Sequence, residues 1–362
     1  MQAIAVFITP HGYGHAARAA AVMAAIARRR PTRFEIFTQV GEAFFTQSLE
    51  TPFGYHPLVT DVGLVQQDAF HEDIPATVAA LSRFYPIPDE AIAAAGRALC
   101  RTHCELVLCD VAPMGILAAR AAGISAVLIE NFTWDWIYRN YSPCPPALAT
   151  QADRLAAIYA TVDRRLQTEP LCAPVPGCLR LPPIARRPHT TATTTRRRLG
   201  VARAQPLVLV TMGGLPEPHT FHAALQDRPE FCFVLPGSGE DIRQDGNVIT
   251  LPHHSDFYHP DLVAAADVVV GKLGYSTVAE VYCAARRFLY VRRPHFPESP
   301  PMAAFVDRTI TSVGISVSAL RSATWLQHLD ALLATPSLAP AHPNGDDAAA
   351  AAVLDGLPSR GK

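Results

Sequence analysis

The chain has 362 residues, more than one hydrophobic core usually serves, so two domains are expected. Hydrophobic residues make up 49% of the chain and charged residues 17%, which excludes a wholly disordered protein and a small module held by disulfides. The 31 Lys and Arg nearly cancel the 32 Asp and Glu, so there is no overall charge to attract nucleic acid or an anionic membrane.

The N-terminal segment predicts a first strand and a turn. It lacks the basic start, long apolar stretch and small-residue cleavage site of a secretory signal. No apolar run approaches the roughly 18 residues of a membrane-spanning helix. The eight cysteines show no paired spacing typical of zinc sites, so we expect no metal, reduced thiols and a cytoplasmic protein.

The first half alternates apolar, strand-like runs with Ala-rich helical stretches, which is the pattern of a parallel sheet covered by helices. The expected strands are 4–8, 34–38, 106–110 and 125–131, with a helix from about His15 to Arg30. These elements predict an α/β domain over residues 1–185, with the boundary in a segment rich in Pro, Thr and Arg.

The second half repeats this pattern and predicts a second α/β domain over residues 186–335. Its expected strands are 206–212, 231–237, 248–252, 267–271 and 287–292. From Pro336 to residue 362, the content of Pro, Ala and Asp predicts a poorly ordered tail.

A glycine loop joins the first strand to its helix. Gly12 and Gly14 permit a tight turn close to a ligand, and the helix start that follows supplies free N–H groups. The spacing also fits a dinucleotide fingerprint, but the acidic residue that this reading needs about twenty residues on is absent, where Thr38 and Gln39 stand. Because packing does not call for the neighbouring histidines, we expect a ligand-facing loop that contains His15.

A second strand, glycine turn and helix start lie at residues 267–280. Gly274, Ser276 and Thr277 offer N–H and hydroxyl groups at the helix N-terminus, and Lys272 adds a positive charge, which together suit a diphosphate. Glu280 follows one turn later, where its carboxylate can accept hydrogen bonds from ribose hydroxyls. The segment fails the P-loop pattern, so an ATPase of that kind is not expected.

Two further features follow strand ends. Gly213 and Gly214 end the first strand of the second half and can bring backbone N–H groups to a phosphate or a sugar. Trp134 and Trp136 follow the strand at 125–131; they suit either stacking on an acceptor or a buried aromatic hinge, and the sequence leaves this open.

Taken together, five segments resemble the N-terminal, glycosyltransferase-like half of plant-type L-arabinokinases and its free-standing bacterial relatives: HGYGHAAR, DVGLVQQDAF, NFTWDWIY, GKLGYSTVAE and VRRPHFPES. The resemblance covers residues 1 to about 335. More distantly, the chain resembles the peptidoglycan N-acetylglucosaminyltransferase and other GT-B enzymes. No phosphate loop of the small-molecule kinase type is found, so kinase activity is not carried over.

The resemblance implies an α/β fold of the GT-B type, with two Rossmann-like domains facing each other across a cleft. The C-terminal domain would hold a nucleoside diphosphate sugar, and the N-terminal domain an acceptor that the sequence does not identify. On the donor side, Glu280 would bind the ribose, Gly274 to Thr277 the diphosphate, Gly213 and Gly214 the donor, and Glu298 the sugar hydroxyls.

The implied activity is transfer of a hexosyl or pentosyl group without a metal ion, since no Asp-x-Asp triplet is present and Lys272 with the helix start can stabilise the leaving diphosphate. His15 would face the reaction centre and is the first candidate base; Asp110, at the end of a strand, is the alternative and equally suits a helix cap. A non-catalytic nucleotide-sugar-binding module and a sugar-nucleotide epimerase are the competing functions.

Overall fold

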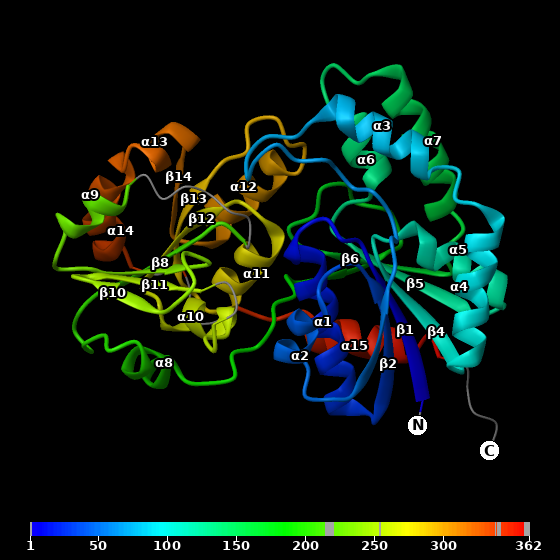
Figure 1. The fold of residues 1–362 in the computed structure, drawn as a ribbon, viewed down its shortest axis with the longest axis horizontal. Helices are drawn as coiled ribbons and strands as arrows, with labels where there is room; N and C mark the ends of the chain where they lie inside the picture. The colour runs from blue at the N-terminus through cyan, green and yellow to red at the C-terminus, as the bar shows by residue number, and fades with distance from the viewer. Residues whose placement is uncertain (1, 214–220, 253–254, 337, 339–341, 358–362) are drawn as a thin grey trace. The chain divides into compact units, whose positions relative to one another are not determined.

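The computed structural model describes residues 2–213, 221–252, 255–336, 338 and 342–357 (Figure 1). The chain divides into two compact units. Unit 1 consists of Met1–Val65, Glu72–Ala185 and Asn344–Lys362, and unit 2 of Gln66–His71 and Arg186–Pro343. The chain therefore leaves unit 1 after residue 185 and returns to it at residue 344.

Unit 1 contains a seven-stranded sheet in the order β3-β2-β1-β4-β5-β6-β7, and all of its neighbouring strands are parallel. The strands are β1 (Gln2–Ile8), β2 (Thr32–Thr38), β3 (Phe53–Pro57), β4 (Cys104–Asp110), β5 (Ser125–Glu130), β6 (Arg164–Thr168) and β7 (Leu179–Leu181). The helices are α1 (Tyr13–Arg29), α2 (Glu42–Ser48), α3 (Ile74–Phe84), α4 (Asp89–Arg101), α5 (Pro113–Ala122), α6 (Trp134–Arg139), α7 (Pro146–Tyr159) and α15 (Asp346–Leu354). The central strands are apolar on both faces because helices cover both sides of such a sheet.

Unit 2 contains a second seven-stranded sheet in the order β10-β11-β9-β8-β12-β13-β14, parallel except for β10. The strands are β8 (Leu207–Thr211), β9 (Cys232–Pro236), β10 (Arg243–Asp245), β11 (Val248–Leu251), β12 (Val268–Lys272), β13 (Arg287–Val291) and β14 (Ser312–Ile315). The helices are α8 (Ala192–Arg198), α9 (His222–Gln226), α10 (His259–Ala265), α11 (Tyr275–Cys283), α12 (Ser299–Thr309), α13 (Val317–Arg321), the 3-10 helix η1 (Thr324–His328) and α14 (Leu329–Ala334). Phe70, from the short segment 66–71, is buried in the core of this unit.

Each sheet has one point at which the strand order reverses. In unit 1 it lies between β1 and β4, and in unit 2 between β8 and β12. Open α/β sheets bind ligands beside the carboxyl ends of the strands at such a point. The residues after these four strands are therefore the ones to inspect for function.

The C-terminal segment differs from the sequence-based expectation. The prediction of a poorly ordered tail from residue 336 is wrong for residues 346–354, which form α15 and pack against α1 (Figure 1). Ala349, Ala350 and Val353 are buried in the core of unit 1. The Ala-rich sequence that resembles low complexity is thus an apolar helix with small side chains, which permits close packing on the equally Ala-rich α1.

The part of the chain that the structure describes contains no helix long and apolar enough to cross a membrane.

Candidate functional site

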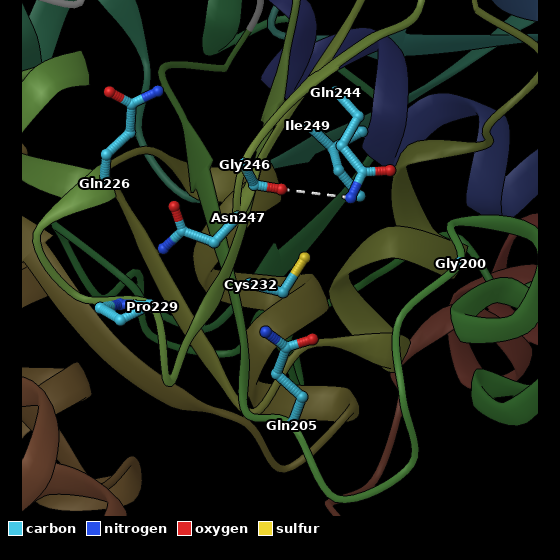
Figure 2. A pocket seen from close by; sticks show the side chains of 9 residues that line it. All are labelled: Gly200, Gln205, Gln226, Pro229, Cys232, Gln244, Gly246, Asn247 and Ile249. Carbon is cyan, nitrogen blue, oxygen red and sulfur yellow. Dashed lines mark hydrogen bonds between the residues drawn. The ribbon is translucent and has the colours of Figure 1, made fainter.

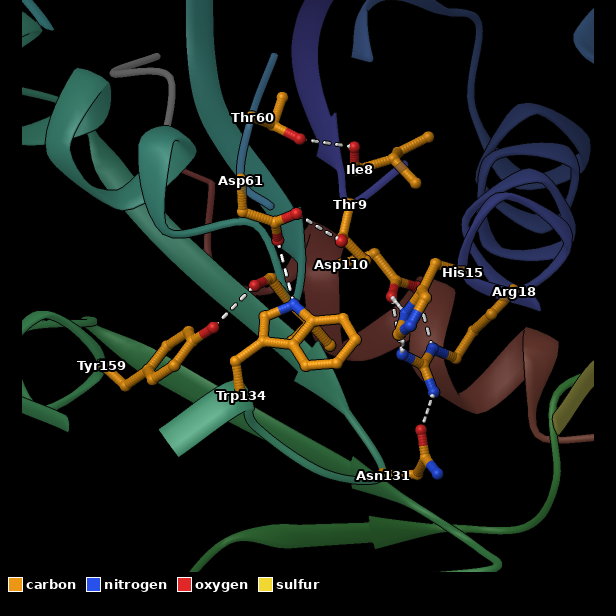
Figure 3. Close-up of polar contacts among 11 residues, drawn as sticks. Ile8, Thr9, His15, Arg18, Thr60, Asp61, Asp110, Asn131, Trp134 and Tyr159 are labelled. Carbon is orange, nitrogen blue, oxygen red and sulfur yellow. Dashed lines mark hydrogen bonds and ion pairs between the residues drawn. The ribbon is translucent and has the colours of Figure 1, made fainter. Parts of the chain in front are cut away.

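His15 and Asp110 meet at the reversal point of unit 1 (Figure 3). His15 lies in the first turn of α1, directly after β1, and Asp110 is the last residue of β4. The two strands are neighbours, and Ile8 pairs with Asp110 in their register. The His15 Nδ1 is 2.8 Å from Asp110 Oδ1, and both side chains are buried. The two residues weighed as alternative bases therefore form one pair.

Arg18 completes this cluster, and sequence reasoning missed it. Its Nε donates to Asp110 Oδ2 at 2.8 Å and its Nη2 to Asp110 Oδ1 at 2.6 Å, while Nη1 donates to Asn131 Oδ1 at 2.7 Å. The side chain is 1% exposed. A signal was present, because Arg18 is three residues after His15 on an otherwise Ala-rich helix, and residues at that spacing share a face. Asp110 does not cap α5, whose N-cap residue is Ala112.

The environment favours a neutral imidazole. Burial lowers the pKa of His15, and the hydrogen bond with Asp110 opposes this shift without reversing it. Burial by itself raises the pKa of the Asp110 carboxyl, but the Arg18 charge and the hydrogen bonds from His15 and Arg18 hold it below its ordinary value. The ionised Asp110 thus accepts the Nδ1–H of a neutral His15, which leaves the lone pair on Nε2. Among the described residues, no hydrogen-bond partner of Nε2 is found.

A second buried carboxyl lies beside this pair. Asp61 accepts hydrogen bonds from the Thr9 hydroxyl at 2.6 Å and from the Trp134 Nε1–H at 3.0 Å (Figure 3). Burial raises the pKa of Asp61 to about 7, with a smaller contribution from the negative charge of Asp110. The segment DVGLVQQDAF, which begins at Asp61, is one of the five that carry the family resemblance, but sequence reasoning assigned this residue no role.

Trp134 is fully buried, which decides the question that the sequence left open for this residue. Its ring packs against Phe132 and Tyr138, and its indole N–H is taken by Asp61. It is therefore part of the aromatic core of unit 1 and offers no open face to an acceptor. Trp136 is half-buried.

The glycine loop before α1 has the conformation that glycine allows. Gly12 is the N-cap residue of α1, exposed, with φ of 71°, a value that L side chains rarely adopt. Gly14 lies in the first turn of α1 and is half-buried. The loop thus leaves backbone accessible at the start of the helix that carries His15.

In unit 2, the predicted diphosphate residues gather at the end of β12 and the start of α11. Lys272 is the last residue of β12 and is half-buried; Gly274 is the N-cap residue of α11. Ser276 is half-buried and Thr277 buried in the first turn of that helix. The N-cap residue Gly274 has no side chain to cap α11, and the start of this helix carries the positive end of its dipole.

The other predicted donor residues have different surroundings. Gly213 follows β8 with φ of 65°, and its backbone N–H faces the Thr211 hydroxyl at 3.4 Å. Gly214 lies outside the described residues. Glu298 is buried at the N-cap position of α12, where its side chain makes no cap hydrogen bond.

Glu280 is buried and already paired within unit 2. Arg186 donates to its Oε1 from Nη2 at 3.0 Å and from Nε at 3.2 Å, and His259 Nδ1 lies 2.7 Å from its Oε2. Burial alone raises the pKa of the Glu280 carboxyl, but Arg186 and His259 outweigh it and hold the pKa below its ordinary value. Sequence reasoning assigned no role to either partner, because a lone Arg in a loop and a lone His at the start of α10 carry no motif.

A separate pocket lies at the amino ends of β8 and β9 (Figure 2). Its volume is about 400 Å³, and its lining includes Gln205, which precedes β8, and Cys232, which begins β9. The predicted donor residues follow the carboxyl ends of the strands, so this pocket is not their site. Within the described residues, no group of three or more His, Cys, Asp or Glu side chains is placed to hold a metal ion.

Comparison with solved structures defines the class of fold. The glycosyltransferase of kitacinnamycin aligns with a TM-score of 0.63 at 16% identity, covering 98% of this chain and 99% of that one. MurG of Acinetobacter baumannii aligns with a TM-score of 0.58 at 16% identity, covering 98% of this chain and 100% of that one. The glycosyltransferase SsfS6 of Streptomyces sp. SF2575, complexed with thymidine diphosphate, aligns with a TM-score of 0.57 at 17% identity. The alignment covers 96% of this chain and 98% of that one. The chain has the GT-B fold of these glycosyltransferases, as the sequence predicted.

The sequence itself is similar to L-arabinokinase of Arabidopsis thaliana. The two are 27% identical over 351 residues, which cover 94% of this chain and 33% of that protein. The chain therefore spans about a third of the length of this relative. The resemblance predicted from the five motifs is confirmed. No family model matches the chain.

Proposed function

We propose that the chain transfers a hexosyl or pentosyl group from a nucleoside diphosphate sugar to an acceptor, with His15 as the base. The observation that carries this proposal is the His15–Asp110 pair. A histidine acts as a base only when its imidazole is neutral and presents a lone pair, and the buried His15 ring held at Nδ1 by a carboxylate meets both conditions. Asp110 orients the ring and stabilises the imidazolium that forms when Nε2 takes the acceptor's proton.

The donor is assigned to unit 2. Lys272 and the N-terminus of α11 provide positive potential for the leaving diphosphate, so the reaction as proposed needs no divalent ion. Gly213, with Gly214 next to it in the sequence, would approach the donor, and Glu298 would hold sugar hydroxyls. Glu280 would accept from the ribose only by sharing its carboxylate with Arg186 and His259.

Kinase activity is not part of the proposal. The chain matches a third of L-arabinokinase, and the sequence lacks a phosphate loop of the small-molecule kinase type. The GT-B fold and the motif resemblance support sugar transfer, and the acceptor is defined only as a hydroxyl compound that reaches His15.

The test is turnover of a donor panel. Purified protein is incubated with uridine, thymidine and guanosine diphosphate hexoses and pentoses, with and without sugar and phenolic acceptors, and released nucleoside diphosphate is measured. We expect acceptor-dependent release that falls about 10²-fold or more in His15→Ala, because a positioned base contributes that much. His103→Asn, at an exposed position, is the matched control and should retain full activity.

Two other outcomes reject transfer, and a third rejects His15 as the base. A donor that binds but stays intact with every acceptor identifies a binding module. A donor converted without acceptor identifies an epimerase. Equal activity of wild type and His15→Ala removes His15 from the mechanism.

A further inference from the structure

His259 has a partner at each ring nitrogen. Its Nδ1 lies 2.7 Å from Glu280 Oε2, and its Nε2 lies 3.2 Å from the Thr211 hydroxyl. Thr211 is the last residue of β8, and Glu280 belongs to α11, which follows β12. The imidazole thus connects the end of β8 with the helix that follows β12, beside the point where the strand order reverses and where such sheets bind ligands.

The side chains of the cluster formed by Glu280, Arg186 and His259 differ in how much of each is exposed. The side chains of Glu280 and Arg186 are 2% and 9% exposed, whereas that of His259 is 26% exposed. The two hydrogen bonds from Arg186 offset the charge of the Glu280 carboxylate. Of the three, His259 is therefore the group that a ligand reaches first, and Glu280 is the group that holds it.

The ring orientation indicates which part of a ligand it meets. Nδ1 faces Glu280, so Nε2 faces the turn after β8, where the Gly213 N–H approaches the same Thr211 hydroxyl. A carboxylate next to a diphosphate is repulsive unless cations stand between them. As an imidazolium, His259 can donate its Nδ1–H to Glu280 and present its Nε2–H to a phosphate oxygen once the Thr211 hydroxyl turns aside.

We propose that His259 binds the diphosphate of the donor through Nε2–H, with Glu280 acting as the residue that fixes its ring. This inference rests on the proposed function, since it assigns the donor to unit 2. It adds to the role proposed for Glu280, whose Oε2 would support a phosphate-binding side chain while the carboxylate is shared with the ribose.

The experiment measures binding by calorimetry for uridine and thymidine diphosphate and, by ligand-detected NMR competition, for the matching nucleosides. For His259→Ala we expect affinity for the diphosphates to fall about tenfold or more, and affinity for the nucleosides to change less than twofold. His259→Gln, whose side-chain amide can donate to a phosphate, should recover part of the loss. His328→Ala in η1 of the same unit is the control and should bind both ligand types like wild type.

The outcomes separate the two proposals. If wild type binds neither diphosphate, the proposed function itself fails. If wild type binds them and His259→Ala binds them equally well, the inference is wrong while the proposed function stands. If His259→Ala loses nucleosides and diphosphates in the same proportion, His259 is structural and the inference is again wrong. If His259→Ala unfolds, His259→Phe, which keeps a ring but cannot donate a hydrogen bond, takes its place, and wild-type affinity of that variant for the diphosphates is the overturning result.

Discussion

At the scale of single residues, the cluster around Asp110 shows how one buried carboxylate is stabilised. Arg18 and His15 supply three hydrogen bonds to its two oxygens, and the Arg18 charge offsets its own. An ion buried without such partners would cost several kcal/mol. The same Arg18 disfavours protonation of His15, so one guanidinium keeps Asp110 charged and His15 neutral.

Arg18→Gln tests this coupling through the pH profile. Burial is the main reason that the pKa of His15 is low, and the positive charge of Arg18 lowers it further. In wild type the acid limb of kcat/KM should therefore fall below the ordinary histidine pKa of 6.5. Removing the charge raises the pKa of His15, so the acid limb should move to higher pH in the variant. An acid limb that stays in place or moves lower would contradict the assignment of His15 as base.

Asp61 predicts a pH dependence of stability. Its ordinary pKa is 3.8, and burial raises the pKa to about 7 in the folded protein. Between these values the unfolded chain loses a proton that the folded chain keeps, so the free energy of unfolding falls as pH rises from about 4 to 7. Asp61→Asn removes this contribution and should be the more stable protein at pH 7, by up to about 4 kcal/mol.

The measurement is urea denaturation of wild type and Asp61→Asn at several pH values between 4 and 7. The contribution of His15, whose lowered pKa makes the fold lose stability as pH falls below 6.5, is common to both proteins and cancels in the difference. Parallel curves over the whole range would show that Asp61 is ionised in the folded protein.

At the scale of elements, small residues allow two pairs of elements to pack closely: β12 against β8, and α15 against α1. A Cβ at Gly271 in β12 would lie 2.6 Å from the Thr211 carbonyl of β8, so the strand end that precedes Lys272 requires glycine. Gly271 lies inside β12, within the strand expected at 267–271. Helix α15 similarly presents alanines to α1, and its start is held by the ion pair between Arg28 and Asp346 at 2.8 Å.

The packing of α15 can be tested by substituting two alanines that lie two residues apart on the helix. Ala350 is fully buried and Ala348 is exposed on the same helix. Ala350→Glu buries a carboxylate in an apolar core and should lower the free energy of unfolding by about 3 kcal/mol or more. Ala348→Glu should change it by less than about 0.5 kcal/mol. Equal denaturation midpoints for the two variants would mean that the C-terminal segment is detached from unit 1.

At the scale of the whole molecule, the sequence predicted the features that repeat locally. Alternating strand and helix patterns indicated two α/β domains. The predicted glycine turns follow β1 and β12, which lie at the two points where the strand order reverses. The pairs of residues that complete the sites could not be predicted, because their members are far apart in the sequence. The separation is 92 residues for Arg18 and Asp110, 52 residues for Thr9 and Asp61, and 94 residues for Arg186 and Glu280. The sequence therefore offers candidates one at a time, and only the folded arrangement of strands, helices and loops brings them together.

The return of the chain to unit 1 at residue 344 has a consequence for biosynthesis. Because α15 closes part of the core that α1 begins, the first unit cannot finish folding on the ribosome until residues 346–354 have left the exit tunnel, after all of unit 2 has been translated. A protein cut short before that point would hold a nearly complete first unit with an uncovered alanine surface, which makes such truncated chains natural targets for chaperones and proteases.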